Sequence, residues 1–460
     1  MRLLALDGTD TIGGTKLLLN YDGLGVMLDF GLNYSVLSRY YEEYMKPRAT
    51  AGLQDLVTMG IVPDARGLYR DDVLLPDFGL TGPEAGKIDF VLASHAHMDH
   101  VGNIGLLRPD IPVVTSAMSA AIMRAVQDSG KGEFGHEILY FNARRIQEKR
   151  GVPVLQPARE PMRLGRDVCI LEGGWSREFE AFWSGFPWPS TSRGRSLEAG
   201  ELRKGVSGLR IRWAPVDHSV KGAVGAILET PQGPVVYTGD IRMHGLHARK
   251  TLEFIEKARA PRPYILFMEG TNIDERRGRW TTEADVLRNA RELIASFGKE
   301  FAIADFGPRN IERLEIFLKA ARESRRRLVV TTKDAYLLHA MRTVDPATPA
   351  PGDDILIYDS PKGVDLGWEE WVLEQYSSAT VRPEAIRESP GDYLVAFSFF
   401  DIKHLVDLRP DGGHYIYSSS EAFNEEMEID FKRLNAWLTK FGLERHGFGF
   451  DRDGGPVFPS

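Results

Sequence analysis

The pattern of apolar and polar positions predicts two kinds of structure, one on each side of residue 275. Before that point, short apolar runs end in glycine or polar residues, as strands do. We expect such strands at residues 88–93, 209–213, 235–238 and 264–267. The run at 209–213 alternates between apolar and polar residues, which is typical of a half-buried strand.

Beyond residue 275, short apolar runs alternate with segments that have the helical period. We expect helices at 281–297, 311–322 and 333–341, and strands at 301–304 and 328–331. Alternation of strands and helices predicts a parallel α/β sheet. The chain is therefore predicted to be an α/β protein, with domains over residues 1–275 and 276–440 and a terminal segment over 441–460.

A cluster of metal-ligand side chains follows the predicted strand at 88–93, where residues 95–100 read His-Ala-His-Met-Asp-His. The side chains of ligand type are His95, His97, Asp99 and His100. In an extended chain, side chains two apart share a face, and a helix opening at Val101 would turn His100 towards Asp99. Neutral imidazoles and a carboxylate are the ligands that zinc takes at catalytic sites. We predict that this loop serves two metal ions, and prefer that to three surface or capping histidines because the spacing is so short.

Two other predicted strands end in residues that can complete a metal site. His218 follows the strand at 209–213, and Asp240 follows the strand at 235–238. An aspartate after a glycine is by itself more often a turn residue than a ligand. Together with residues 95–100, however, the two residues favour a metal site in which the Asp240 carboxylate bridges two ions.

These motifs resemble those of the metallo-β-lactamase superfamily, whose signature is His-x-His-x-Asp-His followed by a distant histidine and a distant aspartate. Residues 217–225 and 237–240 are similar to ribonuclease J and the other β-CASP nucleases. Residues 268–272 resemble the first extra motif of that group, and residues 26–31 resemble its early aspartate-bearing strand. The resemblance implies an αββα sandwich with an inserted or following β-CASP-like parallel α/β domain.

The resemblance also implies roles for individual residues and two Zn²⁺ ions as cofactors. One zinc would be held by His95, His97 and His218. The other would be held by Asp99, His100 and Asp240, with Asp240 bridging. Asp99 and Glu269 would be the catalytic residues, with Asp99 orienting the attacking hydroxide and Glu269 lying at the rim of the active site. Asp29 would orient the imidazoles from behind. Two such ions suit the hydrolysis of a phosphodiester.

One part of the family pattern is missing from this sequence. β-CASP nucleases carry a His-x-Ser-Gly-His-Ala-like segment and a Pro-Val-His-like segment after the inserted domain, and neither occurs here. His446 is a late histidine without that context. We expect that residues 441–460 start a return to the first domain, and that the leaving-group acid and the last zinc ligand lie beyond Ser460.

Composition and charge narrow the class of protein without identifying it. The 460 residues are 43% hydrophobic and 27% charged, as in an ordinary globular protein. No apolar stretch approaches the roughly 20 residues needed to span a bilayer, so we expect no membrane partner and a cytoplasmic location. Cys169 is the only cysteine, so any zinc must be bound by histidine and carboxylate. The net charge of −8 argues against non-specific coating of nucleic acid.

Three further segments leave two readings open. Arg276, Arg277 and Arg279 could line the mouth of a cleft or form a solvated surface. The aromatic residues at 175–188 could stack on bases, or pack a loop or a dimer contact. Residues 305–310 follow a predicted strand, where parallel sheets bind ligands, but a turn before a helix explains them equally well.

The leading functional hypothesis is a zinc-dependent ribonuclease that cleaves RNA as an endonuclease, a 5′ exonuclease or both, with RNA as its partner and a homodimer as a possible state. The first alternative is a hydrolase of a small ester or thioester on the same fold, since fold does not fix substrate. The second is a non-catalytic, nuclease-like subunit that binds RNA. Such subunits usually lose metal ligands, whereas this chain has all six in the positions named.

Overall fold

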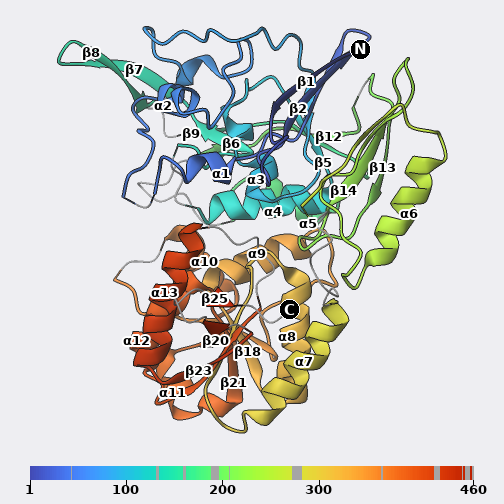
Figure 1. The fold of residues 1–460 in the computed structure, drawn as a ribbon. Helices are drawn as coiled ribbons and strands as arrows, with labels where there is room; N and C mark the ends of the chain where they lie inside the picture. The colour runs from blue at the N-terminus through green and yellow to red at the C-terminus, as the bar shows by residue number, and fades with distance from the viewer. Residues whose placement is uncertain are drawn as a thin grey trace. The chain divides into compact units, whose positions relative to one another are not determined.

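The computed structural model describes residues 1–42, 44–130, 134–158, 162–187, 196–206, 208–271, 282–363, 366–418, 425–447, 449–450 and 456–457. The chain divides into two compact units (Figure 1). Unit 1 comprises Met1–Met243, His247–Asn272 and Thr343–Pro346. Unit 2 comprises His244–Leu246, Ile273–Arg342 and Ala347–Ser460. Each unit has its own sheets, and we describe each separately.

Unit 1 contains a sheet of seven strands in the order β1-β2-β3-β4-β5-β10-β12. Its strands are β1 (Arg2–Asp7), β2 (Lys16–Tyr21), β3 (Leu24–Leu28), β4 (Phe90–Leu92), β5 (Val113–Thr115), β10 (Val168–Ile170) and β12 (Leu202–Lys204). β1, β2 and β3 pair antiparallel with one another, and the pairs from β3–β4 onward are parallel. The carboxyl ends of β3 and β4 therefore lie at the same edge of the sheet.

A second sheet in unit 1 has the order β13-β14-β15-β16. Its strands are β13 (Ile211–Pro215), β14 (Val224–Leu228), β15 (Val235–Tyr237) and β16 (Ile265–Phe267). Leu19, Val26 and Leu92 of the first sheet share one buried core with Leu228 and Val235 of the second. The two sheets therefore pack face to face as a sandwich.

Helices cover this sandwich and connect its strands. The helices of unit 1 are α1 (Tyr34–Leu37), α2 (Leu53–Thr58), α3 (Met98–Val101), α4 (Ala117–Asp128), α5 (Arg177–Ser184) and α6 (Ala248–Arg259). Phe254 and Ala258 of α6 pack against Ile227 and Val236, so α6 covers the outer face of the second sheet. The smaller strands are β6 (Tyr140–Asn142), β9 (Met162–Gly165) and β11 (Ser196–Glu198) in one sheet and β7 (Arg144–Lys149) with β8 (Val152–Pro157) in another.

The aromatic segment at 175–188 mostly packs inside unit 1. Phe179, Phe182 and Trp183 lie on α5 and are buried. Arg124 of α4 donates to the Trp183 carbonyl oxygen at 2.9 Å and faces the Phe182 ring at 5.6 Å. These three rings are therefore packing residues and are not available for base stacking. Trp188 lies outside the described residues.

Unit 2 is built on a seven-stranded sheet in the order β20-β19-β18-β21-β17-β22-β23, in which every pair is parallel. Its strands are β17 (Ala302–Asp305), β18 (Arg327–Val330), β19 (Ile355–Tyr358), β20 (Thr380–Val381), β21 (Tyr393–Ala396), β22 (Gly413–Tyr417) and β23 (Leu443–His446). Its helices are α7 (Glu283–Ser296), α8 (Ile311–Glu323), α9 (Thr332–Arg342), α10 (Gly367–Gln375), α11 (Pro383–Glu388), α12 (Leu405–Leu408) and α13 (Glu425–Lys440). A short pair, β24 (Gly449–Phe450) and β25 (Pro456–Val457), lies outside this sheet.

Helices lie on both sides of the parallel sheet, with α7 and α8 opposite α11, α12 and α13 (Figure 1). Val329 and Val395 of the sheet pack against Leu405 of α12 and Phe431 of α13. The predicted parallel α/β sheet is confirmed, and so is the mixed α/β architecture with a sandwich before it. The α7 start is also as expected, because Thr282 forms a capping box with Asp285.

The end of the chain differs from the prediction. Leu443–His446 forms the edge strand β23 and pairs in parallel with β22 of unit 2. Leu443 is buried in the same core as Tyr415. The expected start of a return to the first domain is therefore wrong for these four residues, because the Leu443 side chain packs in the core of unit 2 and their backbone pairs with the sheet of unit 2.

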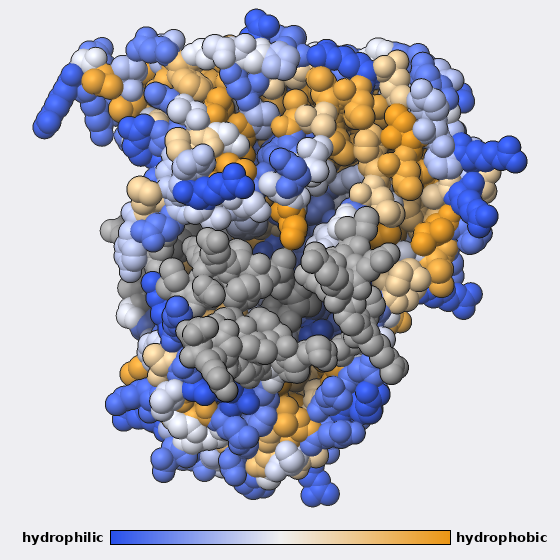
Figure 2. Space-filling view, in the orientation of Figure 1, coloured by the Kyte–Doolittle hydropathy of each residue, from blue (hydrophilic) through white to orange (hydrophobic). Residues whose placement is uncertain are grey.

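Hydrophobic residues reach the surface in several places on the face shown in Figure 2. The exposed large hydrophobic side chains of unit 1 include Leu252, Ile255 and Leu266. Among the helices formed by the described residues, none has the length and apolar character to cross a bilayer.

Candidate metal centre

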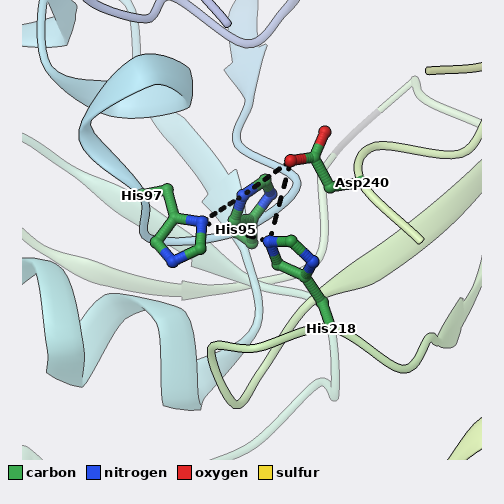
Figure 3. Close-up of side chains that lie close together, drawn as sticks. All are labelled: His95, His97, His218 and Asp240. Carbon is green, nitrogen blue, oxygen red and sulfur yellow. Dashed lines mark hydrogen bonds and ion pairs between the residues drawn. The ribbon is translucent and has the colours of Figure 1, made fainter. Parts of the chain in front are cut away.

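Three histidine side chains of unit 1 converge at the carboxyl ends of its strands (Figure 3). His95 and His97 follow β4, and His218 follows β13. His97 Nδ1 lies 3.1 Å from His95 Nε2 and 3.1 Å from His218 Nε2. His95 is fully buried, whereas the His218 side chain is 15% exposed. His218 is therefore the more accessible of these two histidines.

Asp240 follows β15 and places its two carboxylate oxygens in different surroundings. Oδ2 lies 3.8 Å from His95 Nε2 and 3.7 Å from His218 Nε2, as the dashed lines in Figure 3 indicate. Oδ1 lies 3.3 Å from His100 Nε2. The single carboxylate thus faces the three-histidine group with one oxygen and His100 with the other.

A second group of ligand atoms lies on α3, next to the first. His100 Nε2 lies 3.7 Å from Asp99 Oδ2 as well as 3.3 Å from Asp240 Oδ1. The Asp99 side chain is 27% exposed and that of His100 is 4% exposed. The structure therefore brings together all six residues that the sequence predicts as ligands, in two groups that share Asp240.

The first group fits a zinc-type ion by its donors and by its spacing. Its three imidazoles and one carboxylate offer ligand atoms that all lie within 4.8 Å of one another. Zinc bonds to histidine nitrogen at about 2.0–2.1 Å, so tetrahedral ligand atoms lie roughly 3.3 Å apart. The distances of 3.1–3.8 Å among these atoms are close to that value. His95, His97, His218 and Asp240 could thus hold one ion, and Asp99, His100 and Asp240 could hold another.

Asp29 holds His100 in place from inside the protein. It follows β3, is fully buried and has a backbone φ of 54°, a left-handed conformation that aspartate tolerates better than most residues. Its carboxylate lies 2.7 Å from His100 Nδ1 and accepts hydrogen bonds from the backbone N–H and hydroxyl of Ser94, each at 2.7 Å. The Tyr237 hydroxyl also donates to it. This carboxylate fixes Nε2 of His100 towards Asp99 and Asp240.

The sequence analysis missed several residues that position the ligands. Ser94 contacts both Asp29 and Nδ1 of His95, the latter at 3.0 Å. The buried carboxylate of Asp217 accepts a hydrogen bond from Arg242 at 3.2 Å, and the Arg242 N–H donates to the Asp217 carbonyl oxygen at 2.9 Å. This pair connects the loop that carries His218 to the loop that carries Asp240. Only their adjacency to predicted ligands in the sequence could have indicated them.

The helix that carries Asp99 begins three residues earlier than predicted. α3 spans Met98–Val101, so the expectation of a helix opening at Val101 is wrong. Two loops distant in the sequence form backbone hydrogen bonds with this helical turn. Gly14 N–H donates to the Asp99 carbonyl oxygen and Phe30 N–H donates to the His100 carbonyl oxygen, both at 2.9 Å. These non-local bonds hold a helical turn that the local sequence does not predict.

Charges at the site favour a cation. Burial of the His100 ring lowers its pKa, but the carboxylates of Asp240 and Asp29 outweigh that effect and hold the pKa well above its usual value. Burial raises the pKa of Asp240, but His100 and the neighbouring imidazoles outweigh it and hold this pKa well below its usual value. The Asp240 carboxylate therefore remains ionised, and it stabilises a positive charge beside it.

A substitution at Gly13 tests the second ligand group directly, because Gly13 lies against the Asp99 carboxylate. A Cβ at Gly13 would lie 2.5 Å from Asp99 Oδ2, whereas a Cβ at Gly23 would meet nothing within 4 Å. Both residues have φ of +72°, so alanine causes a similar backbone strain of about 1–2 kcal/mol at each. We expect Gly13→Ala to lose bound divalent metal and Gly23→Ala to retain it, as measured by elemental analysis of the desalted protein. Equal metal content in the two variants would contradict the placement of Asp99.

The sequence singled out further residues beyond the six candidate ligands, of which Glu269 lies close to Asp240, whereas residues 305–310 form a turn in unit 2. The Glu269 carboxylate accepts a weak hydrogen bond from the N–H of Ile241 at 3.3 Å, directly after Asp240. Asp305, at the end of β17, accepts a hydrogen bond from Tyr415, and Asn310 caps α8, so a turn before a helix describes this segment. The arginines at 276, 277 and 279 lie outside the described residues.

Residues 67–288, which include every ligand named above, match the family described as the metallo-beta-lactamase superfamily. The ribonuclease J of Corynebacterium glutamicum is 23% identical to this chain over 279 residues, which cover 59% of this chain and 30% of that protein. The ribonuclease J of Pyrococcus abyssi is 22% identical over 248 residues, which cover 54% of this chain and 39% of that protein. The similarity thus extends over less than half the length of either relative.

The fold as a whole also has a match among solved structures. A crystal structure of a protein of unknown function from Enterococcus faecalis V583 aligns with 96% of this chain and 86% of its own, with a TM-score of 0.66 and 20% sequence identity. At this level of identity the match concerns the fold alone.

Proposed function

This chain contains a metallo-beta-lactamase superfamily domain, a domain type of metal-dependent hydrolases, and on that premise we propose that it is a zinc-dependent ribonuclease. The proposal has two parts, a two-metal hydrolytic centre in unit 1 and RNA as its substrate. Each part depends on different observations and is tested separately.

The position of Asp240 is the observation that carries the two-metal centre. Its Oδ2 faces His95 and His218, and its Oδ1 lies 3.3 Å from His100 Nε2. A carboxylate with one oxygen in each of two donor groups is suited to hold two ions a short distance apart. When bound, two zinc ions would supply Lewis-acid stabilisation of charge on the reacting phosphate and lower the pKa of a water molecule towards neutrality.

The side chains of this chain would then hold and orient the reactants. Asp99 is partly open to solvent, so its carboxylate can accept a hydrogen bond from the attacking water and orient it. Asp29 keeps the protonated nitrogen of His100 turned away from the ligand side. Glu269 acts as a positioning residue, because its carboxylate holds the backbone next to Asp240.

RNA is favoured over a small ester or thioester by two observations. The chain is similar to two ribonucleases J, although only over part of their length. Unit 2 also contains a seven-stranded parallel sheet, and a well-formed second domain counts against a hydrolase that acts only on a small molecule. A non-catalytic subunit is disfavoured because His95, His97 and His218 all retain their nitrogens in ligand positions.

The test is RNA hydrolysis by the zinc-loaded full chain. The substrate is a 5′-monophosphorylated single-stranded RNA, offered beside a DNA of the same sequence and a thioester. We expect cleavage of the RNA by the wild-type chain and a loss of at least about 100-fold in His97→Ala, since metal ligands supply several kcal/mol of transition-state stabilisation. The control is His247→Ala, which removes an exposed histidine of the same unit outside the cluster.

The outcomes separate the two parts of the proposal. Cleavage of the thioester but not of RNA, lost in His97→Ala, would support the metal centre and contradict the substrate. Zinc bound with no hydrolysis of any of the three substrates would contradict the catalytic role. Equal rates for His97→Ala and His247→Ala would contradict the assignment of the centre to these histidines.

A further inference from the structure

A second group of metal-ligand side chains lies in unit 2, outside the centre described above. It consists of His414, Glu444 and His446, whose ligand atoms all lie within 4.8 Å of one another. His414 is the second residue of β22, while Glu444 and His446 lie on the edge strand β23. The sequence analysis noted His446 but assigned it no function, and the proposed ribonuclease mechanism does not use it.

The register of the sheet explains why these side chains meet. His414 pairs with Glu444, and Ile416 pairs with His446, in the parallel ladder between β22 and β23. Side chains two apart on a strand point to the same face, so Glu444 and His446 both lie on the face of His414. Arg445 points to the other face. The juxtaposition is therefore fixed by backbone hydrogen bonds and does not depend on flexible surface loops.

The distances fit a tetrahedral ion. His414 Nδ1 lies 3.1 Å from His446 Nε2 and 3.6 Å from Glu444 Oε2. Tetrahedral zinc ligands at about 2.0–2.1 Å from the ion are roughly 3.3 Å from one another. Two imidazoles and one carboxylate make a protein ligand set that zinc takes with water in the fourth position. The same comparison holds for the centre in unit 1.

The surroundings of His414 orient it as a ligand. Its second nitrogen, Nε2, lies 3.1 Å from the carboxylate of Glu300, which leaves Nδ1 facing Glu444 and His446. Its ring stacks on Phe297, with the centroids 3.7 Å apart and the planes within 9° of parallel. Metal-binding histidines commonly have such a carboxylate on their other nitrogen. Two unrelated surface histidines would not require a carboxylate and a stacked ring that fix the orientation of one of them.

The group is open to an ion from solvent. Glu300, His414 and Glu444 line a cavity of about 520 Å³ at the start of strands β17, β22 and β23. The Glu444 side chain is 69% exposed, and that of His414 is 12% exposed. We propose that His414, Glu444 and His446 bind a divalent transition-metal ion of the zinc class that fastens the edge strand β23 to β22.

The test counts zinc ions bound to the metal-stripped full chain as zinc is added back, by native mass spectrometry. We expect the wild-type chain to bind one ion more than Glu444→Gln or His446→Gln. Glu444→Gln changes an exposed side chain, so the fold is expected to persist even if His446→Gln disturbs it. The control is His404→Gln, a histidine of unit 2 that belongs to neither ligand group found among the described residues.

The ion in unit 2 is separable from those of the catalytic centre. In the His97→Ala background, adding Glu444→Gln should still lower the number of bound zinc ions by one, because the two ligand groups lie in different units. We expect Glu300→Gln to weaken zinc binding at this group by about 10–100-fold, since it removes the carboxylate that orients His414. Equal zinc counts in the wild type, Glu444→Gln and His446→Gln would overturn the proposal, whether or not the chain cleaves RNA.

Discussion

Replacing Asp240 by alanine should lower hydrolysis by about 1,000-fold or more and reduce the metal content at both positions of the unit 1 centre. The reason is that Asp240 places Oδ2 beside His95 and His218 and Oδ1 beside His100, so one carboxylate faces both donor groups. A bound metal ion contributes several kcal/mol to transition-state stabilisation, and each 1.36 kcal/mol corresponds to about tenfold in rate. Losing two ions together should therefore exceed the effect of any single histidine substitution.

The control for this variant is Asp77→Ala, which removes an exposed carboxylate from a turn of the same unit. It should keep the wild-type rate and metal content. Elemental analysis of the desalted proteins and initial rates on the same RNA measure both effects. An Asp240→Ala protein with the same metal content as the wild type would contradict the bridging position. One that loses activity but keeps both ions would instead give Asp240 a direct role on the substrate.

Asp240→Ala and His97→Ala should retain different numbers of metal ions in unit 1, because only Asp240 is shared by the two ligand groups. His97 lies with the first group only, since its Nδ1 contacts His95 and His218. We therefore expect His97→Ala to keep an ion beside Asp99 and His100 in unit 1, while Asp240→Ala weakens both positions. A single, common metal count for the two variants would indicate one ion in this centre instead of two.

The candidate ligands could be picked out from the sequence because they follow strands whose patterns are local. Residues 95–100 carry four of them in six positions, and His218 and Asp240 each end an apolar run. The sandwich and the parallel sheet followed from the same patterns. What local patterns do not contain is the set of contacts behind the ligands. Ser94 and Tyr237 meet Asp29 across 65 and 208 residues, respectively, and only the folded chain brings them together.

The two errors of the sequence analysis have the same cause. α3 begins at Met98 because backbone groups of residues 14 and 30 bond to its carbonyl oxygens, which a local pattern cannot predict. Residues 443–446 have too few apolar positions to indicate which sheet they join. Pairing with β22 decides it, and this pairing is also what brings His446 to His414. Edge strands are therefore where sequence patterns give least information about position.

Replacing Asp29 by asparagine should lower the affinity for the ion beside His100 by about 10–100-fold, as is typical when a carboxylate behind a metal-binding histidine is removed. The Asp29 carboxylate accepts from Ser94 and Tyr237 and contacts His100, all within the protein interior. An amide in its place presents a donor where these groups require an acceptor. Each polar group left without a partner costs about 1–3 kcal/mol, so the free energy of unfolding should fall too.

Asp128→Asn separates the loss of stability from the loss of metal. Asp128 is also buried, accepts a hydrogen bond from a tyrosine hydroxyl, that of Tyr140, at 2.8 Å and pairs with a cation, that of Arg124, at 2.9 Å. It touches none of the six ligands in the contacts described. Both variants should therefore unfold at lower urea concentration, but only Asp29→Asn should bind zinc more weakly in a competition titration against a chelator. Equal zinc affinities would mean that Asp29 only stabilises the fold, and that the orientation of His100 comes from its helix alone.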